Sequence, residues 1–196
     1  MFRGINAIRY LITLIGLTAC VCASAHWTLD NSTSRVSFVT VKAGDIGEVH
    51  HFKSLNGELQ DDGVLDVTIH LASVDTLIPI RDERMQKFLF ETELFPTATF
   101  AANIDMSAVE SVPVGSSQFV DITGTFTVRD TPTPLSLKVM MTRATNKSVV
   151  VSTLQPAIVS ARALGLSEGV EKLRELAGLP SISDAVPVTF VLTFSG

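Results

Sequence analysis

Residues 120–129 read Val-Asp-Ile-Thr-Gly-Thr-Phe-Thr-Val-Arg, and their pattern indicates the fold class. Apolar side chains alternate with polar ones along this stretch, which predicts a strand with one buried face and one face in solvent. The same period of two occurs over residues 65–71, 135–141 and 186–194, and more weakly over 36–42, 48–54, 56–60, 97–104 and 149–161. Short polar turns such as Asp61-Asp62-Gly63 separate most of these segments. The sequence therefore predicts an all-β domain of eight or nine strands.

Two segments follow the helical period of 3.6 residues instead. One runs over residues 81–92, and its shared face is made by Met85, Phe88, Leu89 and Thr92. The other runs over residues 167–177, where Ser167 is the predicted N-cap, Gly178 the residue that ends the helix and Pro180 a stop signal. Many half-buried strands with two short helices are typical of an antiparallel barrel or sandwich.

Residues 1–25 have the features of a secretory signal peptide. Arg3 and Arg9 precede an uncharged apolar run at 11–22, and Ala23-Ser24-Ala25 supplies a cleavage site after Ala25. The run is shorter than the roughly 20 residues of a bilayer span, so we expect no stable membrane insertion after cleavage. Leu-Thr-Ala-Cys at 17–20 resembles a lipobox, which keeps lipidation at Cys20 as an alternative. The predicted product is one domain, residues 26–196, in the periplasm or outside the cell.

Cleavage would change the composition of the chain. Residues 26–196 carry 13 basic and 20 acidic residues, a net charge of −7, which argues against a nucleic-acid partner. They contain neither cysteine nor tyrosine but ten phenylalanines. Cysteine catalysis and cysteine-based metal sites are thereby excluded, and the fold must be held by its core alone. The aromatic composition favours an apolar interior, although periodicity alone cannot distinguish a filled barrel from one that holds a ligand.

No motif supports a catalytic site. Gly-Leu-Ser-Glu-Gly at 165–169 matches the nucleophile elbow of α/β-hydrolases, but all four histidines lie at or before position 70, which is the wrong chain order for that triad. His26 would become the mature N-terminus, where its amine and imidazole could chelate copper with a second histidine. We expect a protein that is not an enzyme and has no cofactor, and keep the copper site as a weaker alternative.

A series of short motifs carries a family resemblance. It consists of Ser-Val-Asp-Thr at 73–76, Arg81-Asp82, the pair Phe88 and Phe90, and Phe95-Pro96 followed by Phe100. Further elements stand at 30–38 (DNSTSRVSF), 122–128 (ITGTFTV) and 182–186 (ISDAV). In this order and spacing, and over nearly all of residues 26–196, they resemble the YceI family of bacterial envelope proteins.

The resemblance implies a lipocalin-like, eight-stranded antiparallel barrel whose lumen holds a polyisoprenoid, an isoprenoid quinone or a fatty-acid-like amphiphile. We expect transport, storage or sequestration of such a lipid without a chemical step. A second copy of the chain, in a homodimer, is kept as a candidate partner. The rival function is a filled barrel that acts as an envelope protein-interaction module. Candidate lumen residues come from the apolar strand faces and from the helix at 81–92, which would form a rim or lid: Phe38, Val67, Ile69, Phe88, Phe90, Phe100, Ile122, Phe126, Val139 and Phe190.

Overall fold

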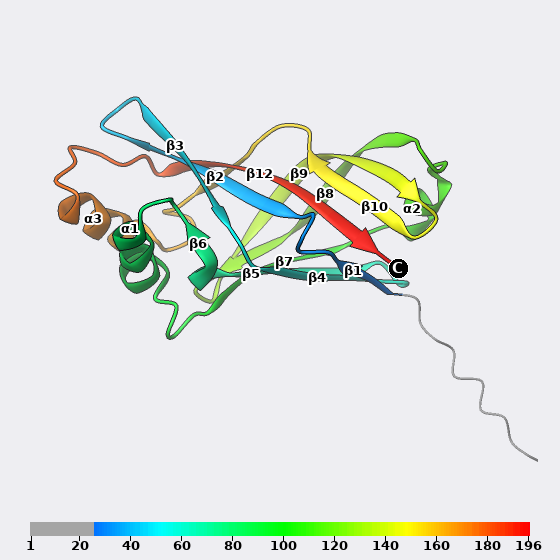
Figure 1. Cartoon of the computed structure of the whole chain (residues 1–196), viewed down its shortest axis with the longest axis horizontal. Helices are drawn as coiled ribbons and strands as arrows, with labels where there is room; N and C mark the ends of the chain where they lie inside the picture. Colours follow the sequence, from blue (N-terminus) through cyan, green and yellow to red (C-terminus); the bar gives the residue numbers. More distant parts are fainter. Residues whose placement is uncertain (1–25) are drawn as a thin grey trace, which may run out of the picture.

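The computed structural model describes residues 26–196, so the predicted signal peptide and Cys20 lie outside the described residues. Eight antiparallel strands of this part close into a barrel (Figure 1). Closure comes from β1 and β12, whose registers pair Thr28 with Ser195 and Leu29 with Phe194. In order around the barrel the strands are β1 (His26–Leu29), β4 (Leu55–Gln60), β5 (Val64–His70), β7 (Thr97–Asn103), β8 (Ser117–Val128), β9 (Thr131–Thr145), β10 (Ser148–Thr153) and β12 (Ala185–Ser195).

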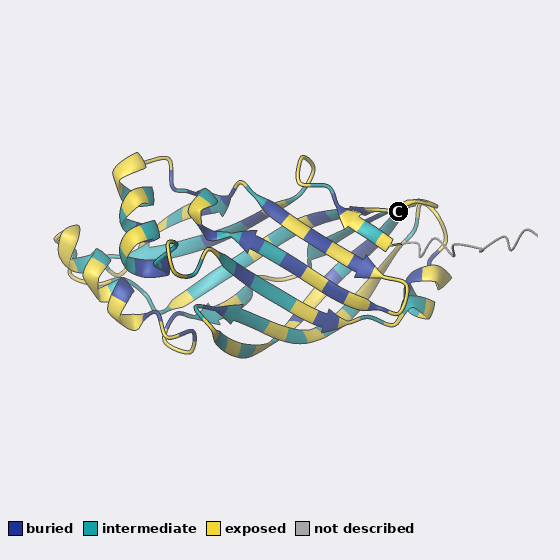
Figure 2. Cartoon of the chain, turned by 90° about the horizontal axis from the view of Figure 1, so that it is seen from below, coloured by how far each residue is buried: buried dark blue, intermediate teal, exposed yellow. Residues whose placement is uncertain are grey.

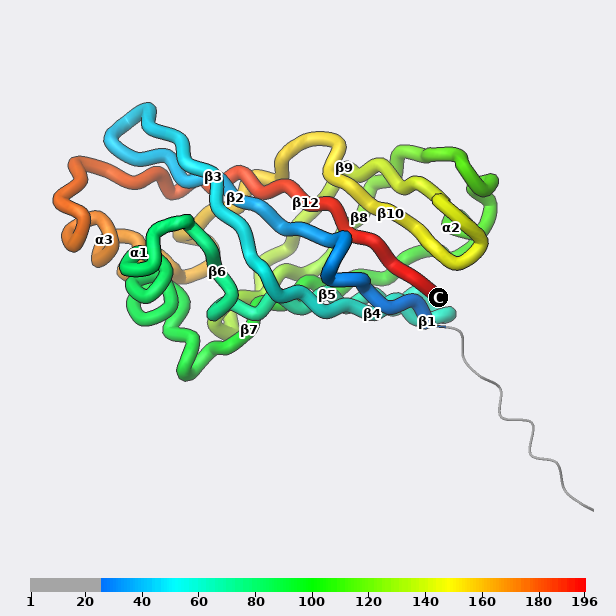
Figure 3. The backbone as a smooth tube through the Cα atoms, viewed as in Figure 1, coloured from blue at the N-terminus to red at the C-terminus, as the bar shows by residue number. Residues whose placement is uncertain are grey.

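Four further strands extend the barrel wall at one end. β2 (Arg35–Lys42) pairs with β12 and with β3 (Ile46–Phe52), and β3 pairs with the short β6 (Val74–Asp75). β11 (Ala157–Ser160) pairs with β12 next to β10. The hairpin of β2 and β3 reaches beyond the other strands, as the tube in Figure 3 shows. The wall is therefore longer on this side of the barrel than a simple eight-stranded closure requires.

The helices gather at the two ends of the barrel. α1 (Pro79–Arg84), the π-helical segment η2 (Met85–Phe90) and α3 (Ser167–Leu176) lie at the end from which the β2–β3 hairpin projects, whereas α2 (Met106–Ser111) lies at the opposite end (Figures 1 and 2). A one-turn helix, η1 (Leu71–Ser73), links β5 to β6. Among residues 26–196, none of the helices combines the length and the apolar character that a bilayer-spanning helix requires.

The alternation in the sequence predicted the barrel strands, although the observed strands begin and end at somewhat different residues than predicted. The region predicted at 149–161 is two strands, β10 and β11, and β1 and β6 were not predicted because each is too short to show a period. The described chain thus has twelve strands rather than eight or nine. The strand faces are separated as predicted, since buried and exposed residues alternate along the strands in Figure 2.

The start of α3 differs from the prediction. Leu166, not Ser167, is the N-cap residue, and no side chain caps this helix. Leu166 is buried, and its amide donates to the Ala161 carbonyl, so packing of the preceding turn sets where the helix begins. The predicted end is confirmed: Gly178 has a φ of +62°, the left-handed conformation that glycine adopts at low cost.

Candidate ligand-binding site

The barrel encloses a cavity of about 710 Å³. Its wall runs from Arg84 and Leu179 at the α1–α3 end to Asp105 and Val109 at the α2 end. Along β8 alone the lining extends from Val120 to Val128, roughly 26 Å of strand, or about 20 Å along the axis of a barrel with the usual strand tilt. This volume lies within the range of small-molecule sites, roughly 300–1,000 Å³.

Side chains of the strands leave the lumen incompletely filled. Phe100, Ile122, Phe126 and Phe190 point inward from their strands and line the cavity, yet each is only partly buried. A tightly packed core would bury such side chains almost completely. Their remaining accessible surface therefore belongs to the cavity, which argues against the filled barrel considered above.

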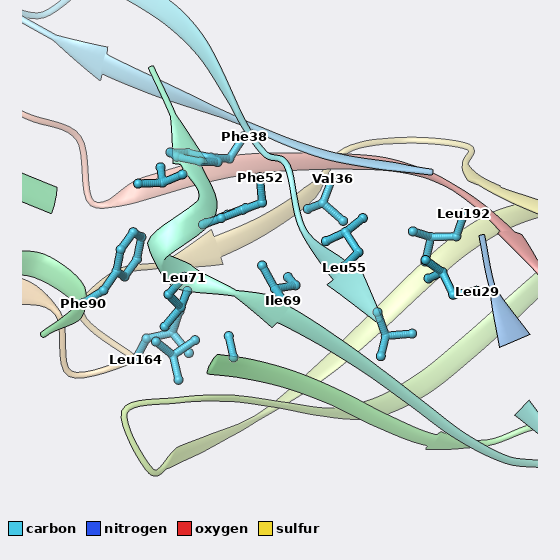
Figure 4. Close-up of a cluster of buried hydrophobic side chains, with 14 of the residues drawn as sticks. Leu29, Val36, Phe38, Phe52, Leu55, Ile69, Leu71, Phe90, Leu164 and Leu192 are labelled. Atoms are coloured by element: carbon cyan, nitrogen blue, oxygen red, sulfur yellow. The ribbon is translucent and has the colours of Figure 1, made fainter. Parts of the chain in front are cut away.

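Nine of the ten residues predicted for the lumen lie on the cavity wall. Two of them, Phe38 and Phe90, form an aromatic cluster with Phe52 at the α1–α3 end. The ring centroid of Phe52 is 5.3 Å from that of Phe38 and 6.0 Å from that of Phe90. Figure 4 shows these three rings facing one another near Leu71 and Leu164. The nine are Phe38, Val67, Ile69, Phe90, Phe100, Ile122, Phe126, Val139 and Phe190.

Phe88 is the exception, and its placement in the lumen was wrong. The predicted helical period assumed 3.6 residues per turn, but the segment after Arg84 is a π-helix with wider spacing. Met85 and Phe90, five positions apart, are consequently both buried, and Phe88 is turned away from the cavity. Its ring lies 5.3 Å from the Lys87 ammonium instead.

Gly124 allows one aromatic side chain to fit in the wall. A Cβ atom at this position would lie 2.6 Å from Cζ of Phe100 and 2.5 Å from the carbonyl oxygen of Ala101 on the neighbouring β7. The Phe100 ring therefore occupies the space that a side chain at 124 would need. Gly124, within the alternating stretch 120–129, thus helps set the shape of the lumen.

The motif at 73–82 fixes the helical end of the barrel. Asp82 accepts hydrogen bonds from the amide (2.8 Å) and hydroxyl (2.5 Å) of Thr76, and Asp75 accepts one from the Leu77 amide at 2.8 Å. Ser73 donates to the His70 carbonyl at 2.6 Å. These local bonds hold the chain between β6 and α1, and so position the helix over the mouth of the cavity.

A polar cluster lines the cavity at the same end. Glu48 Oε2 lies 2.9 Å from Lys42 Nζ and 2.6 Å from Arg81 Nη1, and Arg81 Nη2 donates to the Thr76 carbonyl at 2.7 Å. The hydrogen bond from Lys42, followed by that from Arg81, lowers the pKa of Glu48 and keeps it ionised. The cluster comes from β2, β3 and α1, so only the folded barrel brings it together.

His50 belongs to this polar cluster but is far more buried. It is 2% exposed, Phe38 packs against it with ring centroids 5.3 Å apart, and its Nε2 lies 2.9 Å from Thr40 Oγ1. Burial, with a smaller contribution from the nearby Arg81 charge, lowers the pKa of His50 and favours the neutral imidazole. His51, the next residue on the strand, points to the other face, where its Nε2 lies 3.8 Å from Asp75 Oδ2.

Neither His50 nor Arg81 was predicted as a site residue. The signal was present in the alternation, since the inward positions of the strand at 48–54 include Glu48 and His50, polar residues where the neighbouring Phe52 is apolar. The histidine suggested as a copper ligand, His26, is exposed at the start of β1. Residues 26–196 contain no group of three or more metal-ligating side chains close enough to hold an ion.

A family model for the YceI-like domain matches residues 27–194. The chain belongs to the YceI family. A polyisoprenoid-binding domain from Saccharophagus degradans, implicated in plant cell wall breakdown, shares 33% identity and a TM-score of 0.85, with 88% of this chain and 99% of that domain covered.

More distant solved structures share the fold alone. BcnA of Burkholderia cenocepacia is 19% identical with a TM-score of 0.59, over 84% of this chain and 98% of that protein. The YCEI protein of Campylobacter jejuni is 18% identical with a TM-score of 0.54, over 75% of this chain and 84% of that protein. A comparison with curated proteins found no match. The eight-stranded barrel implied by the sequence motifs is confirmed.

Proposed function

We propose that this chain is an exported carrier that holds a long-chain isoprenoid or a related amphiphilic lipid in the barrel lumen, with no chemical step. The observation that carries this proposal is the cavity of about 710 Å³ that runs through the barrel and is lined mainly by apolar side chains. A lumen of this kind can shield a long hydrocarbon tail from water but offers few groups for chemistry. The predicted signal peptide supports an envelope location, in the periplasm or outside the cell.

The energetics favour a long tail over a small ligand. Moving a tail of about fifteen carbons from water into an apolar lumen contributes about 12 kcal/mol at about 0.8 kcal/mol per CH₂. Association and ordering cost about 4–15 kcal/mol, so a tail of a few carbons would not be retained. The domain from Saccharophagus degradans, which is similar over nearly its whole length, is described as polyisoprenoid-binding, and this supports an isoprenoid tail.

Extraction of the native protein tests this proposal directly. The chain with its own residues 1–25 is expressed in a bacterium, purified from the envelope fraction without detergent, and extracted with organic solvent for mass spectrometry. We expect one dominant class of long-chain lipid in about stoichiometric amount. Protein that yields no lipid and also fails to bind added prenyl compounds would refute the carrier function. Retention of the protein in the cytoplasm would refute export.

A matched pair of substitutions on β8 tests the location of the ligand. Ile122 faces the lumen and lines the cavity, whereas Thr125 is exposed on the outer face of the same strand. We expect Ile122→Trp to block the lumen and lower the lipid recovered by at least about tenfold, because the indole occupies volume that the tail needs. Thr125→Trp should leave the recovered lipid unchanged. Equal loss, or no loss, in both variants would place the ligand elsewhere.

A further inference from the structure

Two nitrogen atoms in the cavity wall are buried without a hydrogen-bond partner. They are Nδ1 of His50 and Nε of Arg81, and within residues 26–196 they are the only side-chain nitrogen or oxygen atoms in this condition. Both residues line the cavity at the α1–α3 end. Buried polar groups are nearly always paired in folded proteins, so an unpaired nitrogen on a residue that lines a ligand cavity points to a polar group of the ligand as its partner.

The remaining polar atoms of both side chains are already engaged. Arg81 directs Nη1 to Glu48 at 2.6 Å and Nη2 to the Thr76 carbonyl at 2.7 Å, which leaves Nε–H as its free donor. His50 Nε2 pairs with Thr40 Oγ1 at 2.9 Å, and the Phe38 ring packs against the imidazole. Neither side chain can turn to satisfy its free nitrogen without breaking these bonds.

The two free nitrogens lie on neighbouring parts of the wall. Glu48 and His50 are two residues apart on β3 and share its inward face, so their side chains emerge roughly 7 Å from each other. Arg81 is bonded directly to Glu48, and its charge acts on His50. One polar end of a ligand can therefore reach both residues while its tail extends past Phe38 and Phe52 into the apolar lumen.

We propose that His50 and Arg81 anchor an uncharged, oxygen-bearing head group, a carbonyl or hydroxyl, of the lipid held in the lumen. The inference rests on the proposed function, since a head group is defined only with respect to a bound tail. A single N–H donor and a single imidazole nitrogen match one or two neutral oxygens. A diphosphate would need several donors at once, and Nη1 and Nη2 of Arg81, its bidentate pair, are already occupied.

The charges around Arg81 also favour an uncharged head group. Glu48 is shared between Lys42 and Arg81, so the Arg81 guanidinium faces the cavity with its charge already partly neutralised. Asp82 adds a further negative charge on α1 that acts on His50. A multiply charged anion would compete with these carboxylates, whereas a neutral oxygen accepts from Arg81 Nε–H without disturbing them.

Four probes with the same fifteen-carbon prenyl tail test the anchor. They end in a hydrogen atom, a hydroxyl group, a benzoquinone ring and a diphosphate, and their binding to delipidated protein is measured by isothermal titration calorimetry. We expect the alcohol or the quinone to bind about tenfold more tightly than the hydrocarbon, since one hydrogen bond to a charged donor contributes about that factor. Comparison of the alcohol with the quinone shows whether a hydroxyl or a carbonyl is preferred.

Two variants identify the residues responsible. His50→Phe removes the imidazole nitrogens but keeps a ring against Phe38, and Arg81→Met removes the Nε–H donor. Each should bring the affinities for the oxygen-bearing probes to within about twofold of the hydrocarbon affinity, which should itself be unchanged. Lys87→Met is the matched control, because Lys87 is exposed on the adjacent η2 and does not line the cavity. If Arg81→Met does not fold, His50→Phe still gives the test.

The outcomes separate the anchor from the carrier function. Equal affinity of the wild-type protein for all the uncharged probes, or tightest binding of the diphosphate, would overturn the anchor and leave the carrier function in place. Loss of hydrocarbon binding in His50→Phe would likewise overturn it, because the residue would then act only through packing. Failure of all four probes to bind the wild-type protein would overturn the carrier function and the anchor together.

Discussion

Substitution of Gly124 by alanine should destabilise the barrel, although alanine is normally the better residue in a strand. The added methyl group would lie 2.5 Å from the Ala101 carbonyl oxygen and 2.6 Å from Cζ of Phe100. The first contact involves backbone, so it can be relieved only if β7 and β8 move apart. The second can be relieved only if the Phe100 ring swings into the lumen.

The expected magnitude follows from two opposing effects. Overpacking of a well-packed site costs about 1–3 kcal/mol, and replacement of glycine within a strand recovers about 0.5–1 kcal/mol. We therefore expect the free energy of unfolding to fall by about 1–2 kcal/mol, and Tm by about 2–8 °C for a domain of this size. A displaced Phe100 ring would also narrow the lumen and weaken the binding of a prenyl probe.

Gly47 provides the matched control on β3. A Cβ atom there would meet only Val39 Cγ1, at 3.9 Å, an ordinary van der Waals contact. Gly47→Ala should leave stability unchanged or raise it by up to about 1 kcal/mol. Urea unfolding followed through Trp27, the only tryptophan of the chain, measures both variants. Wild-type stability of Gly124→Ala, or equal loss in Gly47→Ala, would refute the steric argument.

Three further outcomes are expected. Gly169→Ala should weaken the packing of α3 against η2 and lower Tm by a few degrees, because the added Cβ would lie 2.6 Å from the Phe88 carbonyl oxygen. This contact outweighs the better helix propensity of alanine. An unchanged Tm in a thermal melt would contradict the prediction. Phe52→Ala should cost about 3–5 kcal/mol in urea unfolding because it leaves a cavity in the aromatic cluster, whereas Phe119→Ala, at a position 67% exposed, should cost less than about 0.5 kcal/mol. Because the pKa of His50 is lowered on folding, the unfolded chain takes up its proton first, so stability should be full above about pH 6.5 and fall as the pH drops through and below that value. His50→Phe should lose less stability than the wild type between pH 7.5 and 5.5 in parallel urea titrations, and equal losses would show that another group is responsible.

The strand faces could be predicted from the sequence because their cause is local. Ile122 and Phe126 alternate with threonines, and a strand turns alternate side chains to opposite faces whatever its partner is. The inward direction of the eight lumen residues that lie on strands follows from this rule, whereas Phe90 was chosen from the family motifs. The prediction that Phe88 faces the lumen was wrong because a π-helical segment replaces the regular helix there. Such a segment is set by packing against neighbouring elements rather than by local preference.

The polar anchor required the tertiary structure. His50, Glu48 and Arg81 stand on two elements separated by about thirty residues, and only the folded chain shows that two of their nitrogens are buried without partners. Alternation places His50 on an inward face but cannot say what faces it, because hydrogen-bond satisfaction depends on groups distant in sequence.

The order of side chains along the chain is enough to predict that the domain is all-β and which strand faces are apolar, and the composition shows that residues 26–196 contain no thiol. Those properties depend on side-chain order and composition, which need no knowledge of partners. The open lumen, the position of α1 and η2 at one end of the barrel, and the polar cluster that meets the cavity there are known only from the folded structure. The volume left inside a barrel depends on how every inward side chain packs against the others, and no local pattern contains that information.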